Sequence, residues 1–167
     1  MDLTTINSWN EETAREALTR CCGSGRWVDE MIHRRPFATI EELYQRSDDI
    51  WFSLNGEDWL EAFSHHPKIG GKDSLRAKFA STSQWSAGEQ AGVQAASEEV
   101  LDKLAEGNDA YEKRFGYIFI VCATGKSAGQ MLSLLQQRLN NDPETELHTA
   151  IREQCKITRI RLEKLLS

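Results

Sequence analysis

The 167-residue sequence has no long apolar run, few prolines and no segment that looks like a linker. No stretch approaches the roughly 18 consecutive apolar residues that a membrane-spanning helix needs, which excludes a transmembrane protein. The first seven residues hold no basic segment followed by an apolar one, so no secretory signal is expected. With three prolines and no internal repeat, we expect a single domain over residues 1–167.

Basic residues and paired cysteines are also scarce. Twenty Lys and Arg face 26 Asp and Glu, which gives a formal net charge of −6. A nucleic-acid-binding protein usually carries a basic excess, so that class of function is not expected. The four cysteines (Cys21, Cys22, Cys122 and Cys155) form no C-x-x-C pair. We expect them to be reduced thiols that pack as small apolar residues, as in a cytoplasmic protein.

The chain is rich in signals that start and stop helices. Residues 118–123 alone resemble a β-strand, and they are too short and isolated to build a sheet, so a buried extended segment is expected there. The remaining pattern predicts an all-α fold of about eight helices. The predicted helices cover residues 11–22, 26–34, 39 to about 47, 57–64, 87–105, 109–115, 127–140 and 142 to the C-terminus.

The most unusual segment is Phe63-Ser64-His65-His66-Pro67-Lys68-Ile69-Gly70-Gly71. A proline disfavours helical geometry at the preceding residue, so His66 is predicted where the chain leaves a helix. The carbonyl groups at a helix C-terminus favour a protonated imidazole, and a histidine there suits proton exchange near neutral pH. The alternative is that His65 and His66 are exposed polar residues at a helix end, which spacing alone favours.

A metal site would need more ligands than this segment offers. The chain has no H-E-x-x-H motif and no Cys/His pair at ligand spacing, so no metal is expected. After His66, four basic residues from Lys68 to Lys78 face Asp73 alone. This excess of positive charge could attract an anion, or it could be a solvated basic loop.

Glu89 and the arginines of the last helix each have two interpretations. Ser86 and Glu89 match a capping box, in which Glu89 would only stabilise a helix start. Glu89 could instead be a catalytic carboxylate near His66. Loss of a cap costs about 1 kcal/mol of stability, whereas loss of a catalytic group lowers the rate. Arg159 and Arg161 could each clamp a carboxylate or solvate the surface.

Four elements occur in an order that is similar to one family: Phe63-x-x-His66-Pro67-x-Ile69-Gly70, then Trp85-Ser86-x-x-Glu89-Gln90, then Tyr111-x-x-x-Phe115-Gly116-x-x-Phe119-Ile120-Val121-Cys122-Ala123, then Glu153-Gln154-x-Lys156-Ile157-x-Arg159-x-Arg161-Leu162. From about Leu3 to Leu166 the chain resembles 2-oxo-4-hydroxy-4-carboxy-5-ureidoimidazoline (OHCU) decarboxylases. That family catalyses the last step from urate to (S)-allantoin in purine catabolism. The histidine element and the Ser-x-x-Glu-Gln element are specific only in combination.

The resemblance implies an all-α fold particular to the family, a homodimer, and decarboxylation without a metal or organic cofactor. The chain ends Lys164-Leu165-Leu166-Ser167, which is no peroxisomal tripeptide, so a cytoplasmic protein is expected. The implied catalytic residues are His66 and Glu89. The implied substrate-binding residues are Pro67, Ser86, Gln90, Phe119, Ile120, Val121, Cys122, Ala123 and Arg161, with Arg159 as the alternative to Arg161.

In the mechanism that fits these residues, His66 donates or accepts a proton at or beside the carbon that loses the carboxylate. Whether it acts first as an acid or as a base stays open, and Glu89 would orient the substrate or His66. A rival from another class is a non-catalytic helical binding module that uses the loop 63–72 as a partner surface. A second rival is a metal-dependent hydrolase of ureides that uses His65 and His66, which metal analysis would reveal.

Overall fold

The fold is all-α in a computed structural model, which describes residues 1–67, 75 and 90–167, apart from the side chains of residues 90–97. The described residues form eight helices and no strand, which confirms the predicted fold class. They group into two compact units. The first contains residues 1–66, 120–122 and 148–167, and the second contains residues 67–119 and 123–147. The expectation of a single domain stays a prediction.

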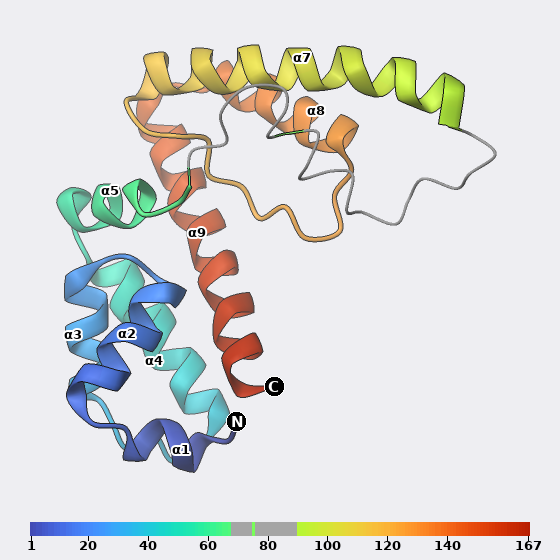
Figure 1. The fold of residues 1–167 in the computed structure, drawn as a ribbon. Helices are drawn as coiled ribbons and strands as arrows, with labels where there is room; N and C mark the ends of the chain where they lie inside the picture. The colour runs from blue at the N-terminus through green and yellow to red at the C-terminus, as the bar shows by residue number, and fades with distance from the viewer. Residues whose placement is uncertain (68–74, 76–89) are drawn as a thin grey trace. The chain divides into compact units, whose positions relative to one another are not determined.

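The first unit is built from five short helices and most of the last one (Figure 1). The first and last residues lie next to each other in this unit: the Met1 ammonium group donates to the Ser167 carbonyl at 3.2 Å. The helices are α1 (Leu3–Ser8), α2 (Glu11–Cys21), α3 (Gly25–His33), α4 (Ile40–Ser53), α5 (Gly56–Ser64) and α9 (Pro143–Leu166), of which residues 148–166 belong to this unit.

Polar caps set the starts of these helices, as the sequence predicts. The Asn10 side chain accepts from the Thr13 N–H at 2.8 Å, and the Thr39 hydroxyl accepts from the Glu42 N–H at 3.0 Å. The Glu42 carboxylate reaches back to the Ala38 N–H, one residue before the Thr39 cap. Helix α1 was not predicted. The predicted helix end near residue 47 was wrong, because buried Ile50 and Trp51 extend the apolar face of α4 and the helix continues to Ser53.

Tryptophans hold α5 and α9 in place within the first unit. The buried Trp51 indole donates to the Ile151 carbonyl of α9 at 2.9 Å, and the Trp59 indole of α5 donates to the Trp51 carbonyl at 3.0 Å. Phe63, which is fully buried near the end of α5, meets Trp51 edge to face with ring centroids 6.5 Å apart. Each indole thus buries a large apolar surface and satisfies its N–H, which fixes where α5 ends beside α9.

The second unit contains α7 (Gln90–Phe115) and α8 (Ala128–Leu139), which lie side by side (Figure 1). The predicted break between residues 105 and 109 was wrong, because α7 runs through Gly107. A Cβ on Gly107 would lie 3.2 Å from Leu135 Cγ, so glycine here allows the close approach of α8. The helix ends at Gly116, whose φ of 85° suits glycine.

A buried ion pair ties the end of α8 to the start of α9 in this unit. Arg138 Nε lies 2.6 Å from Glu146 Oε1 and 3.1 Å from Oε2, and the Glu146 side chain is fully buried. The Arg138 guanidinium lies 4.5 Å from the centroid of the Phe119 ring, and Tyr111 packs edge to face on the same ring at 5.2 Å. Charge and aromatic packing together anchor Phe119.

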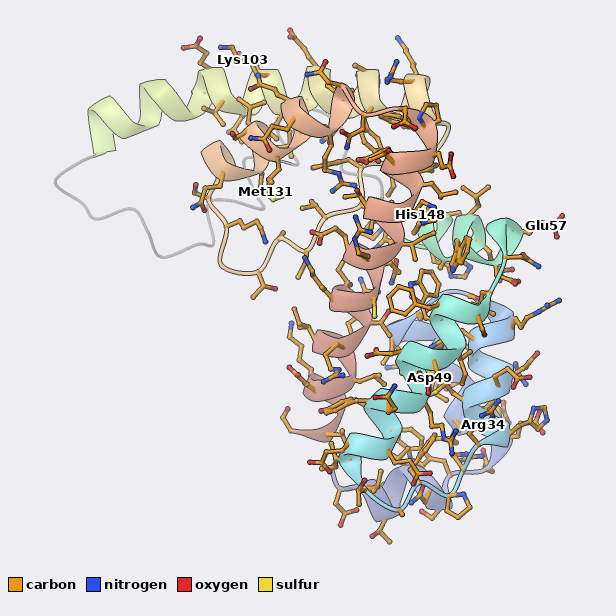
Figure 2. The ribbon with its side chains drawn as sticks, turned by 180° about the vertical axis from the view of Figure 1, so that it is seen from behind. Arg34, Asp49, Glu57, Lys103, Met131 and His148 are labelled. Carbon is orange, nitrogen blue, oxygen red and sulfur yellow. The ribbon has the colours of Figure 1, made fainter. Side chains whose placement is uncertain are left out.

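Residues 118–123 form no helix or strand, and Ile120 and Cys122 are buried, as predicted for a buried extended segment. The four cysteines, all in the described part of the chain, form no disulfide, and burial raises the pKa of Cys22 to about 12. Charged side chains such as Lys103 and Glu57 extend from the outer faces of their helices (Figure 2). Across the described helices, none combines the length and apolar character that crossing a membrane requires.

Candidate active site

His66 lies just beyond the end of α5, where the sequence places it. The helix ends at Ser64, and the His65 and His66 N–H groups donate to the Ala62 and Phe63 carbonyls, each at 3.2 Å. Pro67 then prevents the helix from continuing. His65 is exposed, whereas His66 is partly buried, so the two adjacent histidines differ in environment.

The turn before His66 is supported by Gly23, which follows the end of α2. Gly23 is buried, and a Cβ built on it would lie 2.8 Å from His65 Nδ1 and closer still to the Cγ and Cβ of His65. Only glycine allows the His65 ring to pack on this part of the backbone. Gly23 therefore contributes to the position of the adjacent His66.

Both ring nitrogens of His66 have partners on α9. Nε2 is hydrogen-bonded to Oε1 of Gln154, and Nδ1 lies 3.5 Å from Arg161 Nη2. Burial lowers the pKa of His66, and the positive charge of Arg161 lowers it further, against the opposing effect of the Gln154 hydrogen bond. The expected preference of the helix end for an imidazolium is therefore outweighed, and His66 favours the neutral form.

The partners of His66 share one face of α9. Gln154 and Thr158 are spaced i, i+4, and Arg161 follows three residues later, so all three side chains lie on neighbouring turns. Gln154 is fully buried, and its amide nitrogen donates to Thr158 Oγ1 at 3.0 Å. The Thr158 side chain also acts on the buried Cys22 thiol, whose pKa it lowers against the larger raising effect of burial. Gln154 stands in the fourth element of the family pattern but was given no role, and Thr158 was not predicted, although the helical spacing of both from Arg161 was a usable signal.

The structure distinguishes the two candidate arginines. Residues 159 and 161 are two positions apart, which is about 200° around a helix, so they point in nearly opposite directions. The Arg159 guanidinium lies 4.1 Å from the Tyr44 ring centroid and 3.5 Å from Asp48. Arg161 instead reaches His66, and it donates to the Arg20 carbonyl at 3.4 Å. Arg161, and not Arg159, shares a site with His66.

The segment 119–123 is divided between the two units. In the first unit the Cys122 N–H donates to Glu153 Oε1 at 3.1 Å, and Lys156 lies 2.5 Å from the other carboxylate oxygen. In the second unit the Ala123 carbonyl accepts from the Lys126 N–H at 3.0 Å. Two backbone groups of this segment, whose residues the family resemblance implies in substrate binding, thus have partners within the protein. Glu153, which begins the fourth element of the family pattern but was given no role, orients the backbone of Cys122.

Several predicted residues lie outside the described part of the chain. Ser86, Glu89 and the basic residues of segment 68–78 are among them, and so is the side chain of Gln90, the first residue of α7. Pro67 is exposed, and Val121 is partly buried. The implied roles of these residues stay predictions.

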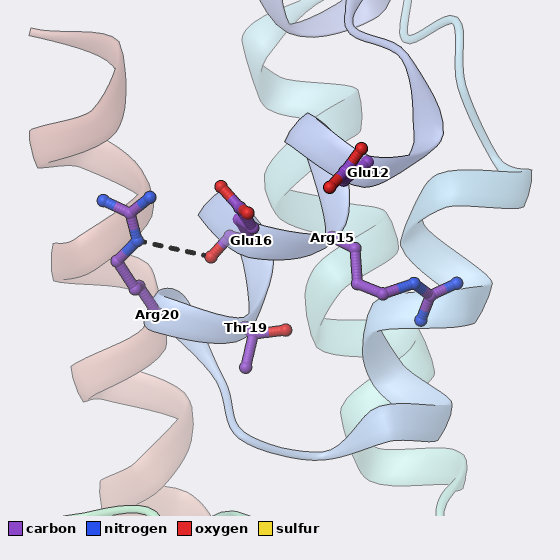
Figure 3. A pocket seen from close by; sticks show the side chains of 5 residues that line it. All are labelled: Glu12, Arg15, Glu16, Thr19 and Arg20. Carbon is purple, nitrogen blue, oxygen red and sulfur yellow. Dashed lines mark hydrogen bonds between the residues drawn. The ribbon is translucent and has the colours of Figure 1, made fainter.

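A shallow pocket of about 430 Å³ lies on α2, away from His66 in the chain (Figure 3). Its lining is held by local contacts: Arg20 donates to the Glu16 carbonyl at 3.3 Å, and Arg15 is paired with Asp29 at 2.6 Å. These are ordinary surface interactions of a charged helix. Among residues 1–67, 75 and 90–167, no cluster of three His, Cys, Asp or Glu could hold a metal ion.

Comparisons with known proteins identify the family. The sequence model of the OHCU decarboxylase family matches residues 7–163. The chain is 43% identical to the uric acid degradation bifunctional protein TTL of Arabidopsis thaliana over 88% of its own length and 45% of that protein. It is 30% identical to an OHCU decarboxylase of Xenopus laevis, over 97% of this chain and 93% of that one.

Two solved structures share the fold. The crystal structure of an OHCU decarboxylase in the presence of (S)-allantoin matches with a TM-score of 0.72 and 38% identity, over 95% of this chain and 99% of that one. The crystal structure of an (S)-allantoin synthase matches with the same TM-score at 18% identity, over 98% of this chain and 54% of that one. The chain spans less than half of the Arabidopsis protein and 32% of a bifunctional relative from Bacillus subtilis. The match over residues 7–163 and the shared fold show that the chain belongs to the OHCU decarboxylase family.

Proposed function

We propose that this protein decarboxylates OHCU to (S)-allantoin in urate degradation, without a metal or organic cofactor. The observation that carries the proposal is the placement of the family's histidine element: the His66 ring lies against Arg161, a cation that can hold a carboxylate. This neighbourhood combines a group that can exchange a proton with a group that can bind an anion.

The reaction needs little more than these two functions. The bond between the ring carbon and the carboxylate breaks, CO2 leaves, and the electron pair of the bond stays on the ring, where the adjacent unsaturated system delocalises it. One proton is taken up for each CO2 released. The protein must bind the anion, favour the delocalised transition state and direct the proton to one face of the ring.

The residues divide these tasks as follows. Arg161 holds the carboxylate or a carbonyl oxygen of the substrate through its planar donors. His66, neutral in the free protein, exchanges the proton and so sets the (S) configuration. Glu89 orients the substrate or His66, and Ser86, Gln90, Pro67 and the segment 119–123 contact the ureido and ring amides; these contacts come from the family resemblance.

The test uses His66→Ala, with His33→Ala as the matched control, because His33 is an exposed histidine at the end of another helix. OHCU is generated in solution from urate with urate oxidase and the hydrolase that follows it, and circular dichroism records the allantoin formed. We expect rapid formation of pure (S)-allantoin with the wild type and with His33→Ala. His66→Ala should be about 10²–10⁴-fold slower while staying folded.

Slow racemic allantoin from the wild type, as in the reaction without protein, would refute the proposed function and favour the binding module. Near-wild-type turnover by His66→Ala would refute the role of His66 but not the proposed function. Stoichiometric zinc or manganese in the active protein would revive the metal-dependent hydrolase. The implied homodimer and cytoplasmic location are part of the proposal, and sedimentation of the purified protein tests the former.

A further inference from the structure

The two nitrogens of the His66 ring face partners with unequal hydrogen-bonding abilities. The guanidinium of Arg161 has only donors, so Nδ1, which faces its Nη2 at 3.5 Å, can only accept. A neutral imidazole carries one N–H, which must then be on Nε2. Gln154 must therefore present its carbonyl oxygen to Nε2, as the structure has it.

The rest of the network is consistent with that orientation. With its oxygen towards His66, Gln154 directs its amide nitrogen at Thr158 Oγ1, 3.0 Å away. The Thr158 hydroxyl, which accepts from Gln154, keeps its own proton free to point towards the Cys22 thiol, whose pKa Thr158 lowers. Gln154 and Cys22 are fully buried, and Thr158 is nearly so. A buried amide keeps one orientation when each of its polar atoms has a suitable partner.

We propose that Gln154, oriented by Thr158, is a positioning residue that keeps His66 in the Nε2–H tautomer and makes Nδ1 the nitrogen that exchanges the proton with the substrate. This inference rests on the proposed function and answers the question that the sequence left open. A His66 ring that enters the reaction with an unprotonated Nδ1 acts first as a base.

The proton balance follows from that order. Nδ1 takes the proton of the substrate hydroxyl, and the carbon–carboxylate bond then breaks to release CO2. Its electron pair passes through the neighbouring ring carbon to a ring nitrogen. The Nδ1–H returns its proton to that neighbouring carbon while the hydroxyl oxygen becomes a carbonyl, and the ring nitrogen takes one proton from solvent. An anionic substrate that engages Arg161 would free Nδ1 for the first step.

The experiment compares the wild type with Gln154→Met and Gln154→Glu, and it reads out the His66 tautomer as well as activity. Methionine keeps the length of the side chain and removes the hydrogen bond, whereas glutamate keeps an acceptor and adds a negative charge. The exposed Gln45, which is bonded to Asp49 on α4, provides the control Gln45→Met. Nitrogen-15 NMR distinguishes a protonated from an unprotonated ring nitrogen.

We expect the wild type and Gln45→Met to show a protonated Nε2 and an unprotonated Nδ1 at neutral pH. Gln154→Met should show a mixture of tautomers and at least a tenfold loss of kcat with little change of KM. Gln154→Glu should keep the Nε2–H tautomer and move the acidic limb of the pH–rate profile to higher pH, because a carboxylate stabilises the imidazolium. In the described part of the chain, the other charged or titratable groups that act on His66 are Arg161 and His65.

A protonated Nδ1 in the wild type, or wild-type tautomer and kcat in Gln154→Met, would overturn the inference. If Gln154→Met does not fold, Gln154→Glu provides the test alone. An acidic limb of its pH–rate profile that stays at the wild-type pH would overturn the inference. The tautomer is measured without substrate. A wild type with the expected tautomer but no decarboxylation would therefore refute the proposed function and leave the tautomer assignment intact.

Discussion

Arg159 and Arg161 should separate stability from activity when each is replaced by methionine. The two arginines lie two residues apart on α9, have similar chemistry and point in different directions. Methionine retains an unbranched apolar stem of similar length, so each change removes mainly the guanidinium. The contacts of each guanidinium then determine what is lost.

The structure supplies the magnitudes. Arg159 stacks on Tyr44 and pairs with Asp48, and for a partly exposed group such contacts are each worth about 0.5–1 kcal/mol. Arg159→Met should therefore cost about 1 kcal/mol of unfolding free energy and leave turnover unchanged. The two hydrogen bonds of Arg161 are long, at 3.4 and 3.5 Å, so Arg161→Met should barely change stability. A lost hydrogen bond to a charged substrate group costs about 1.5–3 kcal/mol, which is about a 10- to 150-fold loss of kcat/KM.

Urea unfolding measures the first quantity, and the initial rate of (S)-allantoin formation at low substrate measures the second. Equal losses of kcat/KM in both variants, or a loss confined to Arg159→Met, would refute the assignment of Arg161 to the site. A large destabilisation by Arg161→Met would show that this arginine is structural.

Two further predictions concern buried charge. Glu146→Leu removes the carboxylate that is paired with the buried Arg138 guanidinium and should lower the free energy of unfolding by about 3–5 kcal/mol. The double variant with Arg138→Leu should lose clearly less than the sum of the two single changes. A loss below about 1 kcal/mol for Glu146→Leu in urea unfolding would contradict this. The lowered pKa of His66 means that, below about 6.5, the unfolded chain binds a proton that the folded protein resists. The stability that this group contributes is thus present above that pH and is lost as the pH falls. The difference in unfolding free energy between the wild type and His66→Ala should therefore shrink from pH 7.5 to pH 5. A difference that stays constant over this range would refute the predicted direction.

Local features were predictable because their causes lie within a few residues. Asn10, Thr39 and Ser127 accept from backbone N–H groups three residues later, as capping requires. Pro67 and Gly116 mark helix ends for equally local reasons. The errors arose where packing overrode local preference: Gly107 lies inside α7 because α8 approaches it through Leu135.

The role of His66 could be suggested from sequence only through family resemblance. Composition and spacing favoured an exposed polar residue, and the rule for helix termini favoured an imidazolium. Burial beside Arg161 reverses the second expectation, because a low-dielectric neighbourhood and a like charge both penalise the protonated ring. Neither effect can be read from the residues adjacent to His66.

By itself, the sequence determined the helical class, most helix starts and the chemical types available for catalysis, since these follow from patterns of a few residues. Tertiary structure decided which of these types meet. Gln154 and Arg161 are 88 and 95 residues from His66. They are brought to it by Trp51 of α4, which donates to the Ile151 carbonyl of α9 and packs on Phe63 of α5. The same packing selects one face of α9, which is why Arg161 shares the site and Arg159 does not: a helix turns by about 100° per residue, and only one face can be buried against its neighbour.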